Sequence, residues 1–306
     1  MCVPSVAVVD CGSNSTRLLV VSGAGSTLRR EMRITRLAAG VDSSGRLTRE
    51  ACDRTYATLS LYRGWMDELD VGRGLLVATS AVRDAVNGQD FLSRAGEIAG
   101  IHARLLSGDE EAAFSYAGAT RGLADDARPT LVVDIGGGST ELAASVDGSL
   151  RGYSMQLGCV RVSERALGSG VVTPGAAAAA TEMISTELDR AFNAVPAFSQ
   201  LVGRVRLVGL AGTVATLAQL VSGVSVYDRA AVHHRLVKRA EVLEWRERLG
   251  ALSPAQRLEL PGMVAGREDV LAAGVYILEA VMDRFGARDV LSSEDDILDG
   301  VAASLV

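Results

Sequence analysis

Apolar residues gather either in short runs or in longer stretches with helical spacing, and the two kinds of segment alternate along the chain. Short apolar runs bounded by turn residues are typical of buried strands, whereas a spacing of three and four residues over ten or more positions is typical of helices. This alternation predicts an α/β class with mixed sheets. The expected helices are 48–69, 89–99, 110–118, 175–194, 241–249, 267–285 and 297–306, and the expected strands are 6–9, 18–21, 75–78, 101–106, 131–133, 142–144 and 206–208.

One strand pattern occurs twice. Asp-Cys-Gly-Ser-Asn-Ser-Thr-Arg begins at Asp10 and Asp-Ile-Gly-Gly-Gly-Ser-Thr-Glu begins at Asp134, each after an apolar run and before a second one. Each copy predicts a β-hairpin whose turn is lined with backbone N–H groups and hydroxyls. Two copies this far apart predict two domains of the same architecture. The polar, turn-rich segment 123–130 places the boundary between them, giving domains 1–126 and 127–306, with the helix 297–306 packing back on the first.

Composition narrows the class of protein. The chain has 306 residues and a net charge of −6, which argues against a generic nucleic-acid binder. No apolar run reaches the roughly 18–20 residues of a membrane span. Lys238 is the single lysine and follows no glycine loop, so the lysine-containing phosphate loop of many nucleotide-binding enzymes is absent. We therefore expect neither a nucleic-acid nor a membrane partner, and an anionic ligand must be held by local geometry.

Cysteine spacing and the first residues suggest a compartment. Cys2, Cys11, Cys52 and Cys159 show no Cys-x-x-Cys spacing, which argues against a zinc site or a disulfide framework. The segment before the first apolar run carries no positively charged region, so a secretory signal is not expected. A reducing cytoplasm fits these features best.

The copy that begins at Asp134 is the strongest local signal for chemistry. A carboxylate at a strand end can hold a divalent cation, because hard cations prefer oxygen ligands. The glycines at 136–138 let backbone amides approach an anion closely, and Ser139 and Thr140 add hydroxyl donors. Glu141 lies across the turn from Asp134. The alternative is a glycine-rich hairpin turn with two solvated acids, and the second copy at Asp10 disfavours it.

Other polar groups are also expected at strand ends. In the first copy Arg17 takes the place of Glu141, so a cation would replace an anion at the equivalent position, an asymmetry suited to phosphoryl transfer. Ser80 and Arg83 follow the strand 75–78, where they either face a ligand or cap a solvated helix. Gly212 and Thr213 follow the strand 206–208, so their amides could face an anion.

A cluster of acids opens the helix 110–118. Acidic residues at the start of a helix are favoured by the helix dipole, and that interpretation suffices for most of them. The alternative is that one glutamate is a general base that activates water. The three histidines, His102, His233 and His234, are not spaced like a zinc cluster, and no role is assigned to them.

Taken together, the motifs closely resemble the exopolyphosphatase/guanosine pentaphosphate phosphatase family. They are the Asp10 turn, Thr-Ser-Ala-x-Arg-Asp-Ala from Thr79, Ser-Gly-x-Glu-Glu-Ala from Ser107, the Asp134 turn and Gly-Arg-Glu-Asp-Val from Gly266. They stand in family order and cover essentially the whole chain. The resemblance implies the actin/sugar kinase/Hsp70 superfamily: two ribonuclease-H-like, actin-type ATPase domains with mixed sheets flanked by helices and the active site in the interdomain cleft.

The resemblance also implies roles for individual residues. Glu111 matches the catalytic base; Asp134 and Glu141 match the acids that bind Mg²⁺ (or Mn²⁺), with Asp10 as their counterpart on the opposing wall. Arg267 would be structural or line the cleft. The phosphate-binding positions would be Ser13, Asn14, Arg17, Ser80, Arg83, Gly136, Gly137, Gly138, Ser139, Gly212 and Thr213.

The implied activity is that of a cytoplasmic, Mg²⁺-dependent phosphoanhydride hydrolase, which we expect to be a homodimer. It would remove terminal orthophosphate from inorganic polyphosphate and, as a further substrate, hydrolyse guanosine pentaphosphate. The chain resembles the short form of the family, and Asp299 stands where many relatives have arginine, so short polyphosphates are expected. A small-molecule kinase of the same superfamily and a non-catalytic alarmone-binding sensor are the alternatives.

Overall fold

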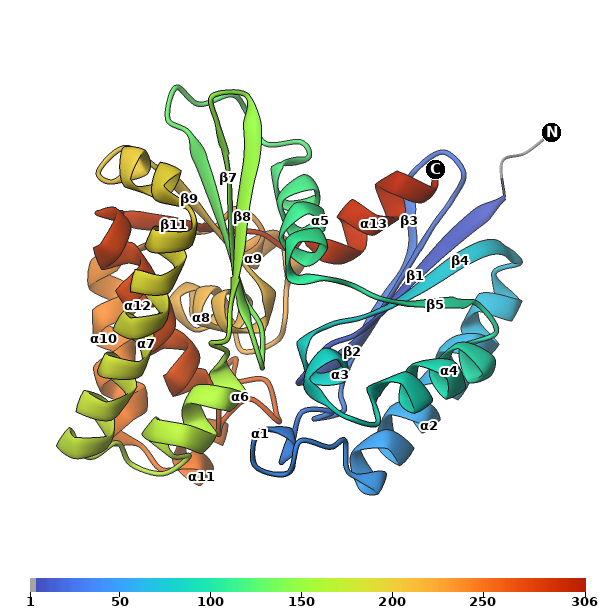
Figure 1. Ribbon diagram of the computed structural model, residues 1–306, viewed down its shortest axis with the longest axis horizontal. Helices are drawn as coiled ribbons and strands as arrows, with labels where there is room; N and C mark the ends of the chain where they lie inside the picture. The colour runs from blue at the N-terminus through green and yellow to red at the C-terminus, as the bar shows by residue number, and fades with distance from the viewer. Residues whose placement is uncertain (1–3) are drawn as a thin grey trace. The chain divides into compact units, whose positions relative to one another are not determined.

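The computed structural model describes residues 4–306, which form two compact units (Figure 1). Unit 1 contains the residues up to Gly118 together with Ile297–Val306, and unit 2 contains Ala119–Asp296. The chain thus passes from one unit to the other earlier than the expected boundary at 126/127, and it returns at Ile297. Cys2 lies outside the described residues.

Unit 1 is built on a five-stranded sheet with the order β3-β2-β1-β4-β5. β1, β2 and β3 are antiparallel neighbours, while β4 and β5 run parallel to β1. Its elements are β1 (Ser5–Cys11), β2 (Ser15–Val21), β3 (Thr27–Ile34), α1 (Val41–Ser44), α2 (Arg49–Glu68), β4 (Val71–Ala78), α3 (Ser80–Asp84), α4 (Gly88–Ala99), β5 (His102–Leu105), α5 (Gly108–Thr120) and α13 (Ile297–Leu305).

Alternating residues of β1 and β2 enter two different cores on the two faces of this sheet. Ala7, Val9 and Leu18 pack in one core with α2 and α4. Val6, Val8 and Leu19 pack in the other with α13 and with Phe114 of α5. Because successive side chains of a strand point to opposite faces, strands buried on both sides read as continuous apolar runs. Figure 1 shows α13, in red, lying against β1 after the long excursion of the chain through unit 2.

Unit 2 is built on a six-stranded sheet with the order β10-β11-β9-β6-β7-β8. β6, β7 and β8 are antiparallel neighbours, and β9 and β11 run parallel to β6. Its elements are β6 (Thr130–Ile135), β7 (Thr140–Val146), β8 (Ser149–Met155), α6 (Cys159–Val162), a π-helical turn (Ser163–Leu167), α7 (Pro174–Ala194), a 3₁₀ turn (Pro196–Leu201), β9 (Arg206–Leu210), α8 (Ala211–Ser222), α9 (Arg229–Val232), β10 (Leu236–Lys238), α10 (Arg239–Ala251), α11 (Pro254–Leu258), α12 (Leu271–Phe285) and β11 (Asp289–Ser292).

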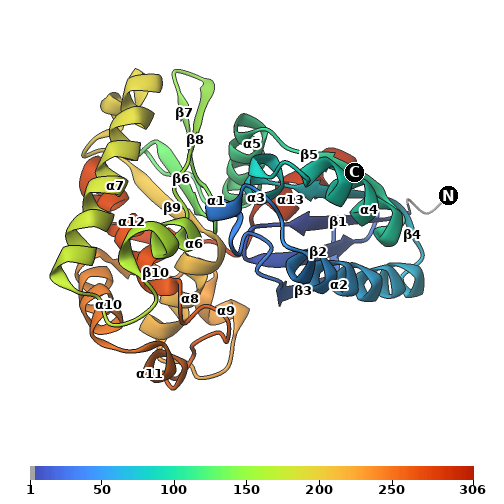
Figure 2. The same cartoon turned by 60° about the horizontal axis from the view of Figure 1, so that its bottom comes forward.

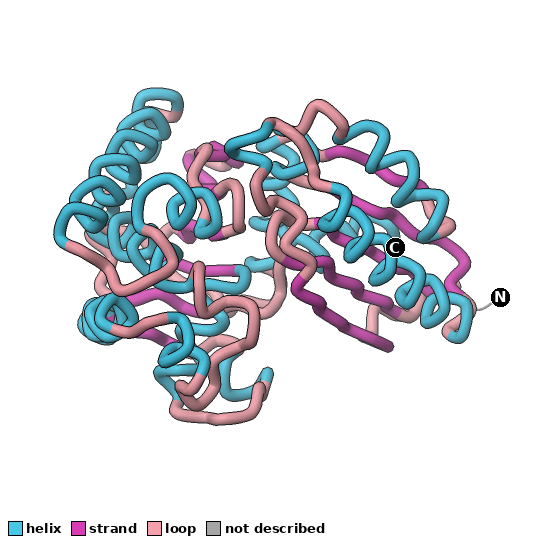
Figure 3. Tube along the Cα trace, turned by 90° about the horizontal axis from the view of Figure 1, so that it is seen from below, coloured by secondary structure: helices cyan, strands magenta, loops and turns pink. Residues whose placement is uncertain are grey.

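A single large core lies between one face of this sheet and helices α7, α8, α10 and α12. α12 is its centre: the helix is buried over most of its length and packs against α6, α7, α8 and α10 (Figure 2). The sheets and helices of both units are distinguished by colour in Figure 3. The α/β class with mixed sheets, predicted from the alternation of apolar segments, is confirmed in both units.

The repeat seen in the sequence is a repeat of structure. In each unit the chain opens with three antiparallel strands, β1-β2-β3 or β6-β7-β8, and parallel strands are then added beside the first. Asp10 is paired with Arg17 across the first hairpin, and Asp134 with Glu141 across the second. The alignment of Arg17 with Glu141 is therefore confirmed by strand register.

The third strand of each unit was not predicted. β3 has the sequence Thr-Leu-Arg-Arg-Glu-Met-Arg-Ile and β8 has Ser-Leu-Arg-Gly-Tyr-Ser-Met, and neither has a continuous apolar run. Both are edge strands of their sheet and are partly exposed, so burial does not impose an apolar pattern on them.

The last long helix begins at Leu271 and not at Arg267, because Arg267 and Val270 form a turn before it. Among residues 4–306, no helix combines the length and apolar character needed to cross a bilayer.

Candidate functional site

In unit 1 the predicted site residues lie where three parallel strands end. Asp10 is the second-last residue of strand β1, Ser80 opens α3 after β4, and Glu111 lies in the first turn of α5 after β5. The paired positions Asp10–Val77 and Val77–Arg104 show that these strand ends are at the same edge of the sheet. Ligands of α/β proteins collect at the carboxyl ends of such strands.

The two charged residues of the first hairpin form an ion pair. Arg17 donates from Nε and Nη2 to Oδ2 of Asp10, at 3.0 and 2.7 Å. Asp10 is buried, and the guanidinium supplies it with charge-assisted hydrogen bonds. The asymmetry between the two hairpins is thus real: Asp10 is paired with a cation, whereas Asp134 faces a second acid.

The first turn is joined to the end of β4. The hydroxyls of Ser13 and Ser80 are hydrogen-bonded at 3.0 Å, and both residues are buried. The carbonyls of Ser13 and Asn14 accept hydrogen bonds from the backbone of residues 35–38, which follow β3. The sequence motifs around Ser13 and Ser80, 67 positions apart, therefore meet at one place.

The acids at the start of α5 have different surroundings. Glu110 forms a capping box with Ser107: its carboxylate accepts from the Ser107 amide, and the Ser107 hydroxyl accepts from the Glu110 amide. Glu111 is 7% exposed, and Arg83 Nη1 lies 3.3 Å from its Oε2. Arg83 also donates to the carbonyl of Leu106, which holds the guanidinium at the end of β5. Glu110 thus fills the helix-start role, while Glu111 is buried beside Arg83.

In unit 2, two carboxylates lie opposite each other across the second hairpin. Asp134 and Glu141 are paired residues of β6 and β7, with exposed fractions of 6% and 2%. Ser154 of β8 donates to Oε1 of Glu141 at 2.7 Å. No group of three or more His, Cys, Asp or Glu residues within 4–306 is arranged to hold a metal ion. A pair of carboxylates nevertheless suits Mg²⁺, which is usually bound by one or two carboxylates together with waters and substrate phosphates.

The glycine turn between these acids is fixed by hydrogen bonds within the turn and from α6. The amide of Gly136 donates to the carbonyl of Ser139 at 3.0 Å and closes the turn. The carbonyls of the three glycines accept hydrogen bonds from α6. The amides of Gly137, Gly138 and Ser139 have no hydrogen-bond acceptor within the described part of the chain. Because these residues are buried, a ligand or solvent is needed to satisfy their amides.

The predicted turn at Gly212 and Thr213 opens α8 at the end of β9. Ala211 has φ 62°, a left-handed conformation that is uncommon outside glycine. Arg267 lies against Gly212, where a Cβ would be 1.8 Å from its Nη1, and this atom donates to the Thr216 hydroxyl at 3.1 Å. Arg267 therefore supports the α8 turn.

Cys159 links this turn to the glycine turn. Burial raises the pKa of the Cys159 thiol to about 11, in spite of the nearby Arg267 charge and a hydrogen bond with Thr213. The thiol is thus protonated at neutral pH and is not a nucleophile. Its contact with Thr213 brings the two phosphate-facing turns predicted in unit 2 into one neighbourhood, which also contains Gly274, where a Cβ would be 2.2 Å from Thr213 Oγ1.

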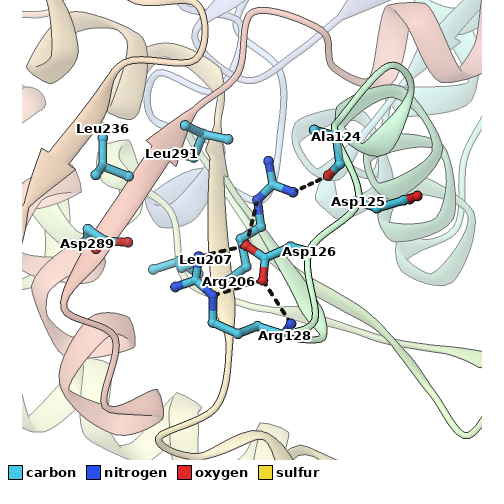
Figure 4. Close-up of a pocket in the computed structure, with 9 residues that line it drawn as sticks. All are labelled: Ala124, Asp125, Asp126, Arg128, Arg206, Leu207, Leu236, Asp289 and Leu291. Atoms are coloured by element: carbon cyan, nitrogen blue, oxygen red, sulfur yellow. Dashed lines mark hydrogen bonds and ion pairs between the residues drawn. The ribbon is translucent and has the colours of Figure 1, made fainter.

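A pocket of about 260 Å³ lies at the edge of the unit 2 sheet opposite the glycine turn, where β9 and β11 begin (Figure 4). Asp126 lies between Arg128 and Arg206 there, and hydrogen bonds from Arg128 lower its pKa to about 2. Arg206 also donates to the carbonyl of Ala124. These contacts fasten the segment 124–128 to unit 2, and the pocket includes none of the site residues predicted from the sequence.

The residues that support the two turns of unit 2 were not predicted from the sequence. Gly158 and Arg161 contact the glycine turn, and Gly274 contacts Thr213. A glycine that is needed only for close packing has no local signature in a single sequence, and α6 is too short for helical periodicity. Residues 35–38 follow β3 and α6 follows β8, and this equivalence is visible only once the two third strands are known.

Comparison with known proteins agrees with this geometry. The model of the Ppx/GppA phosphatase family matches residues 18–306. Exopolyphosphatase 2 of Mycobacterium tuberculosis is 38% identical over 321 aligned positions, covering 100% of this chain and 99% of that protein. An exopolyphosphatase-like protein of known structure is 31% identical, with a TM-score of 0.91 and coverage of 99% and 100%. The family member from Aquifex aeolicus is 27% identical, with a TM-score of 0.79 and coverage of 99% and 97%. The chain therefore belongs to the Ppx/GppA phosphatase family.

Proposed function

We propose that the protein is an exopolyphosphatase that releases terminal orthophosphate from short inorganic polyphosphates with the help of Mg²⁺. The observation that carries the proposal is Glu111: a buried carboxylate at the strand-end edge of unit 1, next to Arg83, while the capping role is filled by Glu110. The relationship to a protein named exopolyphosphatase 2 supports the same substrate class.

In the proposed reaction, Glu111 accepts a proton from water as the water oxygen attacks the terminal phosphorus. The new P–O bond forms in line with the bridging P–O bond that breaks, and the shortened polyphosphate leaves with the electron pair of that bond. Arg83 and the hydroxyls of Ser13 and Ser80 bind the equatorial oxygens.

Asp134 and Glu141 are the residues that would hold Mg²⁺. When bound, the ion neutralises charge on the phosphate oxygens. We expect a chelator to abolish phosphate release, and Asp134→Asn or Glu141→Gln to raise the Mg²⁺ concentration needed for half-maximal rate. Full activity in excess chelator would remove the metal from the mechanism. Circular dichroism of each variant separates this effect from a loss of fold.

The deciding experiment is a phosphate-release assay on purified protein with polyphosphates of graded length, and with guanosine pentaphosphate in parallel. Release without an acceptor supports the hydrolase. Transfer to an added sugar or carboxylate, with no release in its absence, would identify a kinase instead. Binding of the nucleotide without turnover would identify a sensor.

The proposal for short chains rests on charge. The net charge is −6, and the arginines on β3 are engaged within the protein: Arg30 with Asp299, and Arg29 and Arg33 above the ring of Trp65. Asp299, which stands where many relatives carry arginine, thus serves an ion pair between α13 and β3. A long polyanion gains little binding affinity from arginines that are already neutralised by an ion pair or packed on an aromatic ring.

A further inference from the structure

The carbonyl oxygens of the glycine turn all point to α6. Gly136 accepts from the Cys159 amide at 2.9 Å, and Gly137 accepts from the Val160 amide at 2.9 Å. Gly138 accepts from Nε of Arg161 at 2.8 Å. Three consecutive peptide groups are therefore fixed by a helix of four residues that follows β8.

Fixing these carbonyls also fixes the amides. In a trans peptide the C=O of one residue and the N–H of the next point in opposite directions within one rigid plane. With the carbonyls of Gly136, Gly137 and Gly138 held toward α6, the N–H groups of Gly137, Gly138 and Ser139 must point away from it. These are the amides that have no acceptor among residues 4–306, so α6 orients three donors to the side of the turn that faces away from the helix.

The contact depends on the absence of a side chain at position 158. A Cβ on Gly158 would lie 2.3 Å from the carbonyl carbon and oxygen of Gly137 and 2.5 Å from the nitrogen of Gly138. The backbone of Gly158 is extended, with φ −140° and ψ 164°, which any residue can adopt. Glycine is thus required here for space and not for conformation.

Unit 1 uses the same arrangement with unrelated residues. Ser13 accepts from the Ala38 amide at 2.8 Å, and Asn14 accepts from the amides of Thr35 and Arg36 at 3.0 and 2.9 Å. As in unit 2, the donors follow the third strand of the sheet. The two supporting segments, residues 35–38 and 158–161, differ in sequence, yet each holds the carbonyls of its turn. This indicates that orienting the amides is the purpose of the contact.

We infer that Gly158 and Arg161 are positioning residues for phosphate binding: through the glycine carbonyls they direct the amides of residues 137–139 at the anion. The identity of the anion as a polyphosphate rests on the proposed function, whereas the positioning itself does not. Neither residue needs to touch the substrate for this role.

The test measures binding and turnover in four variants: Gly158→Ala, Arg161→Ala, Arg161→Lys and the control Gly175→Ala. Gly175 is exposed, and a Cβ there meets nothing within 4 Å. Binding of inorganic tripolyphosphate is followed by calorimetry and, with ¹⁵N-glycine labelling, by the amide signals of Gly137 and Gly138. KM and kcat for tripolyphosphate and the thermal midpoint are measured in parallel.

We expect Gly158→Ala and Arg161→Ala to raise Kd for tripolyphosphate tenfold or more, with KM rising in step and kcat falling less. Arg161→Lys should recover most of the affinity, since an ammonium can still donate to the Gly138 carbonyl, and Gly175→Ala should behave as wild type. Unchanged Kd in folded Gly158→Ala and Arg161→Ala would overturn the inference, as would amide signals of Gly137 and Gly138 that do not respond to tripolyphosphate.

Two further outcomes are distinguishable. If Gly158→Ala does not fold, the inference is tested by comparing Arg161→Ala with Arg161→Lys. An equal loss of tripolyphosphate affinity in both variants would contradict a role for the hydrogen bond to the Gly138 carbonyl. If the wild type binds tripolyphosphate through these amides without hydrolysing it, the positioning stands and the proposed function fails.

Discussion

Two adjacent glutamates show how strongly position decides the role of a side chain. Glu110 and Glu111 differ by one step along α5, which turns them about 100° apart on the helix. Glu110 therefore reaches back to the Ser107 amide, while Glu111 is buried beside Arg83. From the sequence, both fitted the helix dipole equally well, and only the resemblance to a family favoured Glu111.

This difference gives a matched pair of variants. Glu111→Gln keeps the size and most hydrogen bonds of the side chain but removes the proton acceptor, so kcat for polyphosphate should fall by about 10²–10⁴. Glu110→Gln can still accept from the Ser107 amide and should retain kcat within a few-fold. Turnover that is equal in the two variants would show that Glu111 is another helix-start acid.

Ala211 is a second residue whose backbone matters more than its side chain. Its left-handed φ of 62° costs a non-glycine residue about 1–2 kcal/mol, and glycine loses about 0.5–1 kcal/mol more entropy on folding than alanine. Ala211→Gly should therefore raise the free energy of unfolding by up to about 1 kcal/mol.

Ala178→Gly in α7 is the control, since glycine in an ordinary helix costs about 1 kcal/mol relative to alanine. Urea unfolding of both variants should give shifts of opposite sign. A destabilised Ala211→Gly would mean that the turn contains no relievable strain. Strain of this kind clusters at binding sites, and this turn precedes Gly212 and Thr213.

At the scale of elements, the sequence predicted those segments that bury a continuous or periodic apolar face. The helix expected at 48–69 is α2, which begins after the Thr48 cap and ends at Glu68. The hairpins were predicted because their inner strands are buried on both sides. β3, β8 and α6 were not, because edge strands and a four-residue helix are defined by main-chain partners that lie far away in the sequence.

The same division applies to the candidate site. Its acids, arginines and glycines carry chemistry that can be recognised in a motif, and the structure brings each set together within its own unit. The supporting contacts of Gly158, Arg161 and Gly274 could not be predicted, since they consist of close approaches between backbones and side chains of distant segments.

The packing of α13 against α5 can be tested at a glycine. Gly300 lies against α5, where a Cβ would be 2.0 Å from the carbonyl oxygen of Phe114. Gly300→Ala should lower the free energy of unfolding by about 1–3 kcal/mol, because backbone must move to admit the methyl group. Ser304→Ala, exposed on the same helix, should change it by less than about 0.5 kcal/mol. Equal stability of the two variants in urea unfolding would contradict this packing.

At the scale of the whole molecule, charge sets an expectation for substrate length. Exposed ion pairs are worth only about 0.2–1 kcal/mol each, so a long polyanion gains affinity only where many unengaged cations lie along it. With a net charge of −6 and the β3 arginines engaged, we expect kcat/KM per chain end to be as high for short polyphosphates as for long ones. A steep rise with chain length at fixed Mg²⁺, lost at high salt, would reveal a basic track. The solution mass should be measured alongside, because a dimer could build such a track from two chains.

The return of α13 to the first sheet has a consequence for how the protein is made. Val6, Val8, Leu19 and Val21 on β1 and β2 are covered by residues of α13, which the ribosome reaches only after it has made all of unit 2. Domains commonly fold in the order of synthesis, N-terminal first. Here unit 2, continuous in sequence, can complete its core while unit 1 still exposes an apolar face on a nascent chain. Unit 2 should therefore finish folding before unit 1, although it is synthesised later. Until α13 is made, the uncovered apolar face of the unit 1 sheet is the surface that a chaperone would most need to protect.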